Sequence, residues 1–193
     1  AMEKPLSAQK PGASGLLALD WNNGNRTVLV DARLTGLLLG QTLHTEAHEI
    51  YRAYIEATAF GALTIIRRVE EHGVKIDEII NTGGLSIKNA ALMQIYADVI
   101  GKPMKVSQSE QTCALGAAIF GAAAAGVDSI GALQARVTAV REKVYHPIPE
   151  NAAVYQELYA LYRTLHDAFG TREWSGNLHR VMKRLLEIRA GQG

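Results

Sequence analysis

The stretch from residue 76 to residue 125 alternates strand-like and helix-like segments, and this order constrains the fold more than any other feature. Residues 76–81 have strand character, and residues 89–100 carry a helical pattern. Residues 104–107 then form a second short strand, followed by a helix of small side chains over residues 111–125. A strand, helix, strand, helix succession is typical of α/β domains. We therefore predict an α/β fold.

The segments before this stretch predict a hairpin and a long helix. Residues 15–21 and 27–31 are apolar or β-branched and flank an Asn-Asn-Gly-Asn turn, which is the pattern of two paired strands. Residues 46–72 carry helical periodicity. Their expected inward side consists of Ile50, Ala53, Ala57, Phe60, Thr64 and Ile65.

The C-terminal third is predicted to be helical. One amphipathic face steps by three or four residues through Val154, Leu158, Leu161, Leu165 and Phe169. A last helix is expected over residues 175–190, with its basic side chains on a solvated face.

These segments predict three regions along the chain. We expect residues 1–14 to be a flexible leader or the remainder of an expression tag. Residues 15–128 would form the α/β lobe, and residues 129–193 a helical extension.

Composition excludes several classes of protein. Hydrophobic residues make up 48% and charged residues 20%, which is ordinary for a globular chain, and the net charge of +1 indicates neither a nucleic-acid nor a membrane partner. Cys113 has no second cysteine to pair with, and we expect it to be a small buried residue. The longest uncharged apolar stretch, residues 113–127, is too short to span a bilayer, and we expect no signal peptide, because residues 1–14 contain no apolar run. We expect a cytoplasmic protein.

Thr82-Gly83-Gly84 is the best candidate for a binding site. It lies at the predicted carboxyl end of a strand, where ligands of open α/β sheets collect, and glycines there let a ligand approach the backbone closely. Lys88 could add positive charge, and Asn89 could either bond a base edge or cap the following helix. A plain turn without ligand remains the alternative.

Residues 110–126 are the second candidate. Gly116, Ala117, Gly121 and Ala124 recur at helical spacing, so another backbone could approach this helix closely. It is either a core helix or a crossing point between two lobes. His44 and His48 are four residues apart, a spacing that can bind a metal ion, but no further ligand residue clusters with them in the sequence.

Several ordered motifs resemble the C-terminal signature of the FGGY carbohydrate kinases. They run from Gly15 to Phe169, and the segment Leu19-Asp-Trp21 with Asn23-Gly-Asn-Arg26 is similar to the branch of this family that phosphorylates ribulose. The motifs are Gly36-Leu-Leu-Leu-Gly40, Glu49-Ile-Tyr-Arg-Ala-Tyr-Ile-Glu56, Gly83-Gly84, Lys88-Asn89, Leu92-Met-Gln94, Ala97-Asp98, Gly101-Lys-Pro103, Glu110 and Ala114-Leu-Gly-Ala-Ala-Ile119.

The resemblance implies a ribonuclease-H-like fold of the actin, Hsp70 and sugar-kinase superfamily, with ATP in the cleft between two lobes. The chain would be a later part of the ATP-side lobe with C-terminal helices. Gly83, Gly84, Lys88 and Asn89 would bind ATP, and the helix around Gly116 would connect the two lobes. The phosphate turns, the Asp base, most Mg²⁺ contacts and the sugar site would belong to the preceding part of such an enzyme, so no catalytic or metal-binding residue is assigned here.

The expected reaction is therefore transfer of the ATP γ-phosphoryl group to L-ribulose, with this chain alone inactive. Two alternatives stay open: another pentulose or polyol kinase of the family, and a non-catalytic nucleotide-binding or regulatory module. A homo-oligomer is compatible with the sequence.

Overall fold

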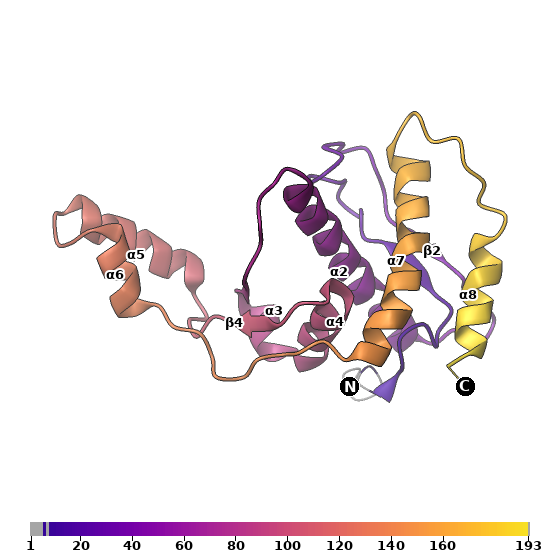
Figure 1. The fold of residues 1–193 in the computed structure, drawn as a ribbon, viewed down its shortest axis with the longest axis horizontal. Coiled ribbons are helices and arrows are strands. Elements are labelled where there is room, and N and C mark those ends of the chain that lie inside the picture. The colour runs from indigo at the N-terminus through magenta and orange to yellow at the C-terminus, as the bar shows by residue number, and fades with distance from the viewer. Residues whose placement is uncertain (1–5, 7, 193) are drawn as a thin grey trace.

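The computed structural model describes residue 6 and residues 8–192, and it has the mixed α/β composition expected (Figure 1). In chain order the elements are β1 (Leu17–Leu19), β2 (Leu37–Leu39), α2 (Ala47–Glu71), β3 (Ile79–Asn81), α3 (Gly84–Lys88), α4 (Ala90–Ile100), β4 (Met104–Val106), α5 (Thr112–Ala124), α6 (Ile130–Val137), α7 (Pro149–Gly170) and α8 (Val181–Ala190). None of the helices in this described part is long and apolar enough to cross a lipid bilayer.

The predicted strand and helix alternation is confirmed in the middle of the chain. β3 and β4 pair in parallel, with Ile79 opposite Met104, and the short helix α3 and then α4 connect them. α4 begins at Asn89, whose side chain accepts a hydrogen bond from the helix, and it ends at Gly101 in the left-handed conformation. This is a parallel β-α-β unit, although β3 is shorter than the predicted strand.

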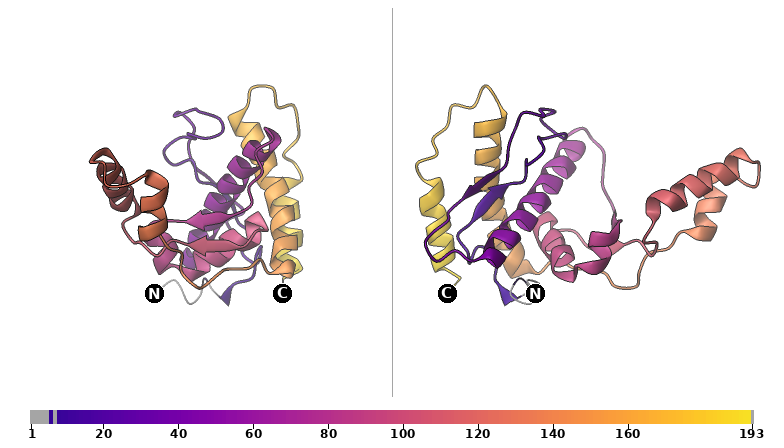
Figure 2. Two further views of the ribbon diagram at one scale, coloured as in Figure 1. Left: turned by 60° about the vertical axis from the view of Figure 1, so that its left-hand side comes forward. Right: turned by 180° about the vertical axis from the view of Figure 1, so that it is seen from behind.

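The core lies where α2, α4 and α7 meet β1. α2 packs on α4 and β1, and α7 packs on α4 and β1 (Figures 1 and 2). All three residues of β1 are buried, because helices cover it. The largest fully buried side chains include Tyr155, Tyr162, Phe60, Leu19, Met93, Leu158 and Leu165.

The predicted hairpin over residues 15–31 is wrong. β1 pairs antiparallel with β2, so that Leu17 faces Leu39, while residues 22–31 form a loop closed by a bridge between Asn25 and Asp31. A buried strand needs an apolar partner, and three consecutive leucines in β2 satisfy this better than a segment that includes Val30, which is 80% exposed.

The leader predicted for residues 1–14 lies partly outside the described residues, namely at 1–5 and 7. Its described part is packed at several positions: Leu6 is fully buried, and Pro11, Gly12 and Ser14 are buried, whereas Ala8 and Lys10 are exposed. Gly12 has φ +75°, and a β-carbon on it would stand 2.6 Å from Cγ2 of Ile188 in α8.

The C-terminal helices are partly as predicted. α7 covers the expected amphipathic segment, but its buried face is Tyr155, Leu158, Tyr159, Tyr162, Leu165 and His166, while Phe169 is 53% exposed. The buried face is rotated because tyrosines of α7 fill the space toward Phe60 of α2. α6 is an additional helix, and α8 starts later than residue 175.

Candidate functional site

The predicted site lies at the carboxyl ends of β3 and β4, which meet at one edge because the two strands are parallel. The backbone N–H of Ser107, just after β4, donates to the carbonyl of Asn81 at the end of β3 at 2.9 Å. This bond joins the two loops that follow the strands. Open α/β sheets bind ligands at such an edge.

Gly83 and Gly84 lie at this edge, and at both the space that a side chain would occupy is free of described atoms. Gly83 has φ +91°, which favours glycine, and it precedes the first residue of α3. A β-carbon built on either glycine would meet nothing within 4 Å among the residues described. The turn itself is held by Ser86, whose Oγ donates to the Gly83 carbonyl at 2.8 Å. The backbone here is accessible to a ligand.

Lys88 and Asn89 follow in sequence but differ in environment. Lys88 is exposed at the end of α3, whereas Asn89 is only 5% exposed. Oδ1 of Asn89 accepts from the backbone N–H of Leu92 at 2.9 Å, and its Nδ2 donates to the Tyr51 hydroxyl at 3.4 Å. Of its two expected roles, the helix cap is the one present within this chain.

α5 and α6 form a hairpin that stands away from the body (Figure 1). Ile119 is the one buried residue of α5, and no described atom outside its own helix lies within 4 Å of a β-carbon built on Gly116. The core-helix interpretation is therefore wrong, and so is the expectation that Cys113 is buried, because Cys113 is exposed. α5 is exposed because it packs mainly on α6.

Asp20, directly after β1, and Asp31, in the loop of residues 22–31, lie in different environments. Asp20 follows β1 beside a cavity of about 360 Å³ that Tyr96 and Tyr162 also line, and burial raises the pKa of its carboxyl group. Asp31 accepts from the Arg33 backbone N–H at 2.8 Å, and this bond lowers its pKa. Within residues 6 and 8–192, no three His, Cys, Asp or Glu side chains gather as they would around a metal ion.

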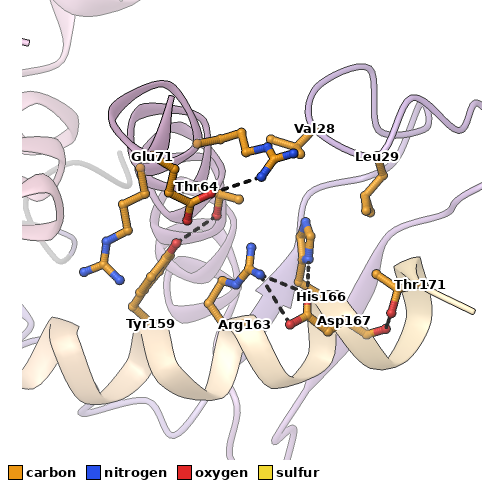
Figure 3. A pocket seen from close by; sticks show the side chains of 11 residues that line it. Val28, Leu29, Thr64, Glu71, Tyr159, Arg163, His166, Asp167 and Thr171 are labelled. Atoms are coloured by element: carbon orange, nitrogen blue, oxygen red, sulfur yellow. Dashed lines mark hydrogen bonds and ion pairs between the residues drawn. The ribbon is translucent and has the colours of Figure 1, made fainter. Parts of the chain in front are cut away.

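Figure 3 shows a second cavity, of about 290 Å³, between α2, α7 and the loop that carries Val28 and Leu29. His166 on its wall is 3% exposed, and its Nδ1 lies 2.8 Å from Oδ1 of Asp167. Burial lowers the pKa of the His166 imidazole below 6.5, against the opposing effect of the Asp167 hydrogen bond. Sequence reasoning missed this pair. The available signal was a His-Asp step directly after Leu165 on the amphipathic face.

Comparison with known proteins identifies relatives over almost the whole chain. Residues 1–125 match the family described as FGGY family of carbohydrate kinases, C-terminal domain. A ribulokinase of Geobacillus thermodenitrificans is 52% identical over 190 residues, which cover 95% of this chain and 33% of the relative. A ribulokinase of Mycolicibacterium smegmatis is 46% identical over 183 residues, covering 94% of this chain and 31% of the relative.

Two solved structures share the fold over most of the chain. A ligand-bound xylulose kinase of Lactobacillus acidophilus superposes with a TM-score of 0.72 at 26% identity, over 86% of this chain and 34% of its own. A xylulose kinase of Rhodospirillum rubrum superposes with a TM-score of 0.67 at 28% identity and the same coverage. The chain thus spans about a third of the length of the relatives and structures that it matches.

Proposed function

This chain belongs to the FGGY family of carbohydrate kinases, and from that premise we propose that it works as the C-terminal part of an ATP-dependent L-ribulose kinase. The proposed reaction converts ATP and L-ribulose to ADP and L-ribulose 5-phosphate. Residues 1–125 match the C-terminal domain of this family. We place this activity in the cytoplasm, where ATP is available.

One observation carries the choice of sugar. Identity to a ribulokinase reaches 52% over 190 residues, whereas it is 26% to a xylulose kinase of similar fold. The difference favours ribulose over xylulose as the substrate class. Because the chain covers 33% of that ribulokinase, we propose that the sugar is bound mainly by the preceding two thirds of the protein.

We propose that ATP is held over the open edge of β3 and β4. The backbone at Gly83 and Gly84 fits the close approach of a nucleoside, since a β-carbon built on either glycine would meet no atom of the described chain within 4 Å. Lys88, at the exposed end of α3, would supply a positive charge. Asn89 would contribute the remaining N–H of its amide, because its Oδ1 already caps α4.

Phosphoryl transfer depends on positioning and on electrostatic stabilisation rather than on covalent chemistry by the protein. In this proposal the chain positions the nucleotide, and the α5–α6 hairpin forms the connection to the other lobe. The Asp that takes the proton of the sugar hydroxyl, and most contacts to the Mg²⁺ that neutralises phosphate charge, come from the preceding part of the protein. The chain alone should therefore be inactive.

The reaction is tested with the protein at the full length of its relatives. Supplied with ATP and Mg²⁺, it should phosphorylate L-ribulose in preference to D-xylulose, while the 193-residue chain gives no turnover. Preference for D-xylulose would overturn the choice of sugar. Turnover that follows the 193-residue chain through purification would overturn the proposed division of labour.

The nucleotide site is tested separately by Gly84→Val. Since a β-carbon at Gly84 has free space, the variant should fold as stably as the parent and raise the KM for ATP, with the KM for the sugar nearly unchanged. Ala160→Val is the control, because Ala160 is exposed on α7 and lies outside both the proposed nucleotide site and the α5–α6 hairpin. An unchanged KM for ATP in Gly84→Val would remove the glycine turn from the proposed site.

A further inference from the structure

We propose that the cavity between α2, α7 and the Val28–Leu29 loop binds a small hydroxylated anion, such as a sugar phosphate or a sugar acid. The guanidinium of Arg163 would hold the oxyanion, and Nε2 of His166 would accept a hydrogen bond from a hydroxyl group. The cavity of about 290 Å³ is separate from the glycine turn, so this site does not depend on the proposed kinase reaction.

The strongest observation is an unpartnered atom of a buried side chain. His166 is 3% exposed, and its Nε2 has no hydrogen-bond partner in the described part of the chain. In Figure 3 the imidazole rises from α7 with this nitrogen directed toward the Val28–Leu29 loop. Trp21 packs edge-on against the ring with centroids 5.4 Å apart, which holds its orientation. Buried polar atoms are nearly always hydrogen-bonded, so a partner is expected here.

The contact on the other ring nitrogen decides what that partner must be. Nδ1 lies 2.8 Å from Oδ1 of Asp167, and a carboxylate can only accept, so Nδ1 carries the proton. In a neutral imidazole Nε2 then presents a lone pair. Burial, which lowers the pKa of His166, favours this neutral form. The missing partner is therefore a donor, such as a hydroxyl.

Arg163 makes the same cavity suitable for an anion. It lies beside His166 on the preceding turn of α7, and its Nη2 is 3.1 Å from Oδ1 of Asp167 (Figure 3). One carboxylate thus positions both the guanidinium and the imidazole. The other charged lining residues are Arg67, Arg68 and Glu71, so the lining holds three arginines and two carboxylates. Arg68 pairs with Glu71 on α2, as Arg163 does with Asp167 on α7, and Arg67 is left without a carboxylate partner among the lining residues. The excess positive charge favours an oxyanion, which a guanidinium binds with two hydrogen bonds.

A hydroxyl acceptor also lines this cavity. The Thr64 hydroxyl donates to the Phe60 carbonyl at 2.9 Å, so in its 3.2 Å contact with Tyr159 the tyrosine is the donor. The Tyr159 oxygen then keeps a lone pair for a second ligand hydroxyl. Arg67 lies over the Tyr159 ring, 4.4 Å from its centroid, and holds the ring in place. The lining therefore combines cationic donors with neutral acceptors, which matches an anion that carries hydroxyl groups.

Binding is tested on the 193-residue chain by calorimetry with four probes. D-ribose 5-phosphate and D-gluconate carry both an anionic group and hydroxyls, whereas D-ribose and inorganic phosphate each lack one of them. We expect one of the first two to bind at least about tenfold more tightly than either control probe, and which one binds identifies phosphate or carboxylate as the anion. No binding of either, or equal binding of inorganic phosphate, overturns the proposal.

Two measurements test whether the probe binds in this cavity: the affinity of cavity variants, and the resonances of His166 in the parent chain. Arg163→Gln and His166→Phe should each weaken binding at least about tenfold, while Arg184→Gln, at an exposed arginine of α8, should leave it unchanged. Because His166 is buried, thermal melting checks that His166→Phe still folds. In the parent chain the His166 ring proton resonances should shift on saturation with the bound probe. Unshifted resonances, or full affinity in both cavity variants, overturn the assignment of this cavity.

Discussion

Arg52 and Tyr155 join α2 to α7 through a buried hydrogen bond, in which Nη2 of Arg52 donates to the tyrosine hydroxyl at 2.8 Å. The hydroxyl in turn donates to Oε1 of Glu56 at 2.9 Å, and Nε of Arg52 donates to the same carboxylate at 2.7 Å. Nη1 of Arg52 donates to the carbonyls of Leu6 and Gln9. Two buried charges on α2 are thus paired, and their hydrogen bonds join α2 to two segments that are far away in sequence, residues 6–9 and α7.

Tyr155→Phe should destabilise the chain through this network. The change keeps the ring but removes a hydroxyl that both accepts from Arg52 and donates to Glu56. Two buried charged groups then lose a partner, which costs roughly 1 to 3 kcal/mol. Urea unfolding of the parent and the variant measures this difference.

The matched control is Tyr54→Phe on α2. Tyr54 is half-buried, and its hydroxyl makes no hydrogen bond with the described residues. We expect its unfolding free energy to stay within about 0.5 kcal/mol of the parent. If both variants unfold alike, the network does not hold α2 to α7.

His166 should make stability fall as the pH is lowered. Burial lowers the pKa of its imidazole below the ordinary 6.5, so above pH 6.5 it is neutral in the folded and the unfolded chain alike. As the pH falls below 6.5, the unfolded chain binds a proton that the folded chain does not yet accept. The free energy of unfolding from this group therefore decreases by up to about 1.4 kcal/mol per pH unit until the folded pKa is reached.

This dependence is measured by urea unfolding at several pH values between 7.5 and 5 in the parent and in His166→Gln. The difference in unfolding free energy between the parent and His166→Gln should become smaller as the pH falls. His179→Gln is the control, since His179 is exposed before α8. If the unfolding free energies of the parent and of His166→Gln change in parallel with pH, the buried imidazole is not kept neutral in the folded chain.

The long helices were predictable from sequence, and so was the central β-α-β unit. The pattern at 46–72 matches α2 at Ala47–Glu71 because 25 residues give several turns of consistent periodicity. The ends of α4 followed from Asn89 as cap and Gly101 as stop. These signals are local, so they can be recognised in the sequence without knowledge of which distant segments come into contact.

Features that depend on distant segments were not predictable in this way. β1 pairs with Leu37–Leu39 across a loop, and the choice between this strand and residues 27–31 depends on which segment the helices leave exposed. The His166 cavity needs a wall from Val28 and Leu29, more than a hundred positions earlier. The Gly83–Asn89 turn lies on the sheet edge as expected, but its role toward ATP stays a prediction.

Gly116→Leu should change the melting temperature of the complete kinase but not lower that of the 193-residue chain. In the 193-residue chain a side chain at Gly116 meets nothing within 4 Å, and leucine favours helix over glycine by about 1 kcal/mol, so the melting temperature should not fall. In the complete protein a crossing helix would be forced apart, at a cost of about 1 to 3 kcal/mol. Ala118→Leu, at an exposed position, is the control in both proteins. An unchanged melting temperature in the complete protein would argue against a close crossing.

Asn89→Ala should affect stability and ATP binding through different atoms. Oδ1 of Asn89 accepts from the Leu92 N–H at 2.9 Å, so losing this cap should lower the free energy of unfolding by about 1 kcal/mol without ligand. If the amide also donates to nucleotide, ATP affinity of the complete protein should fall about five- to a hundredfold.

Asn89→Asp separates these two effects, because a carboxylate still caps a helix but has no N–H to donate. It should keep the ligand-free stability close to the parent while losing ATP affinity as Asn89→Ala does. Both quantities are measured side by side, by urea unfolding and by calorimetric titration with ATP. If Asn89→Ala is destabilised and both variants bind ATP as the parent does, Asn89 serves only as the cap of α4 and leaves the proposed ATP site.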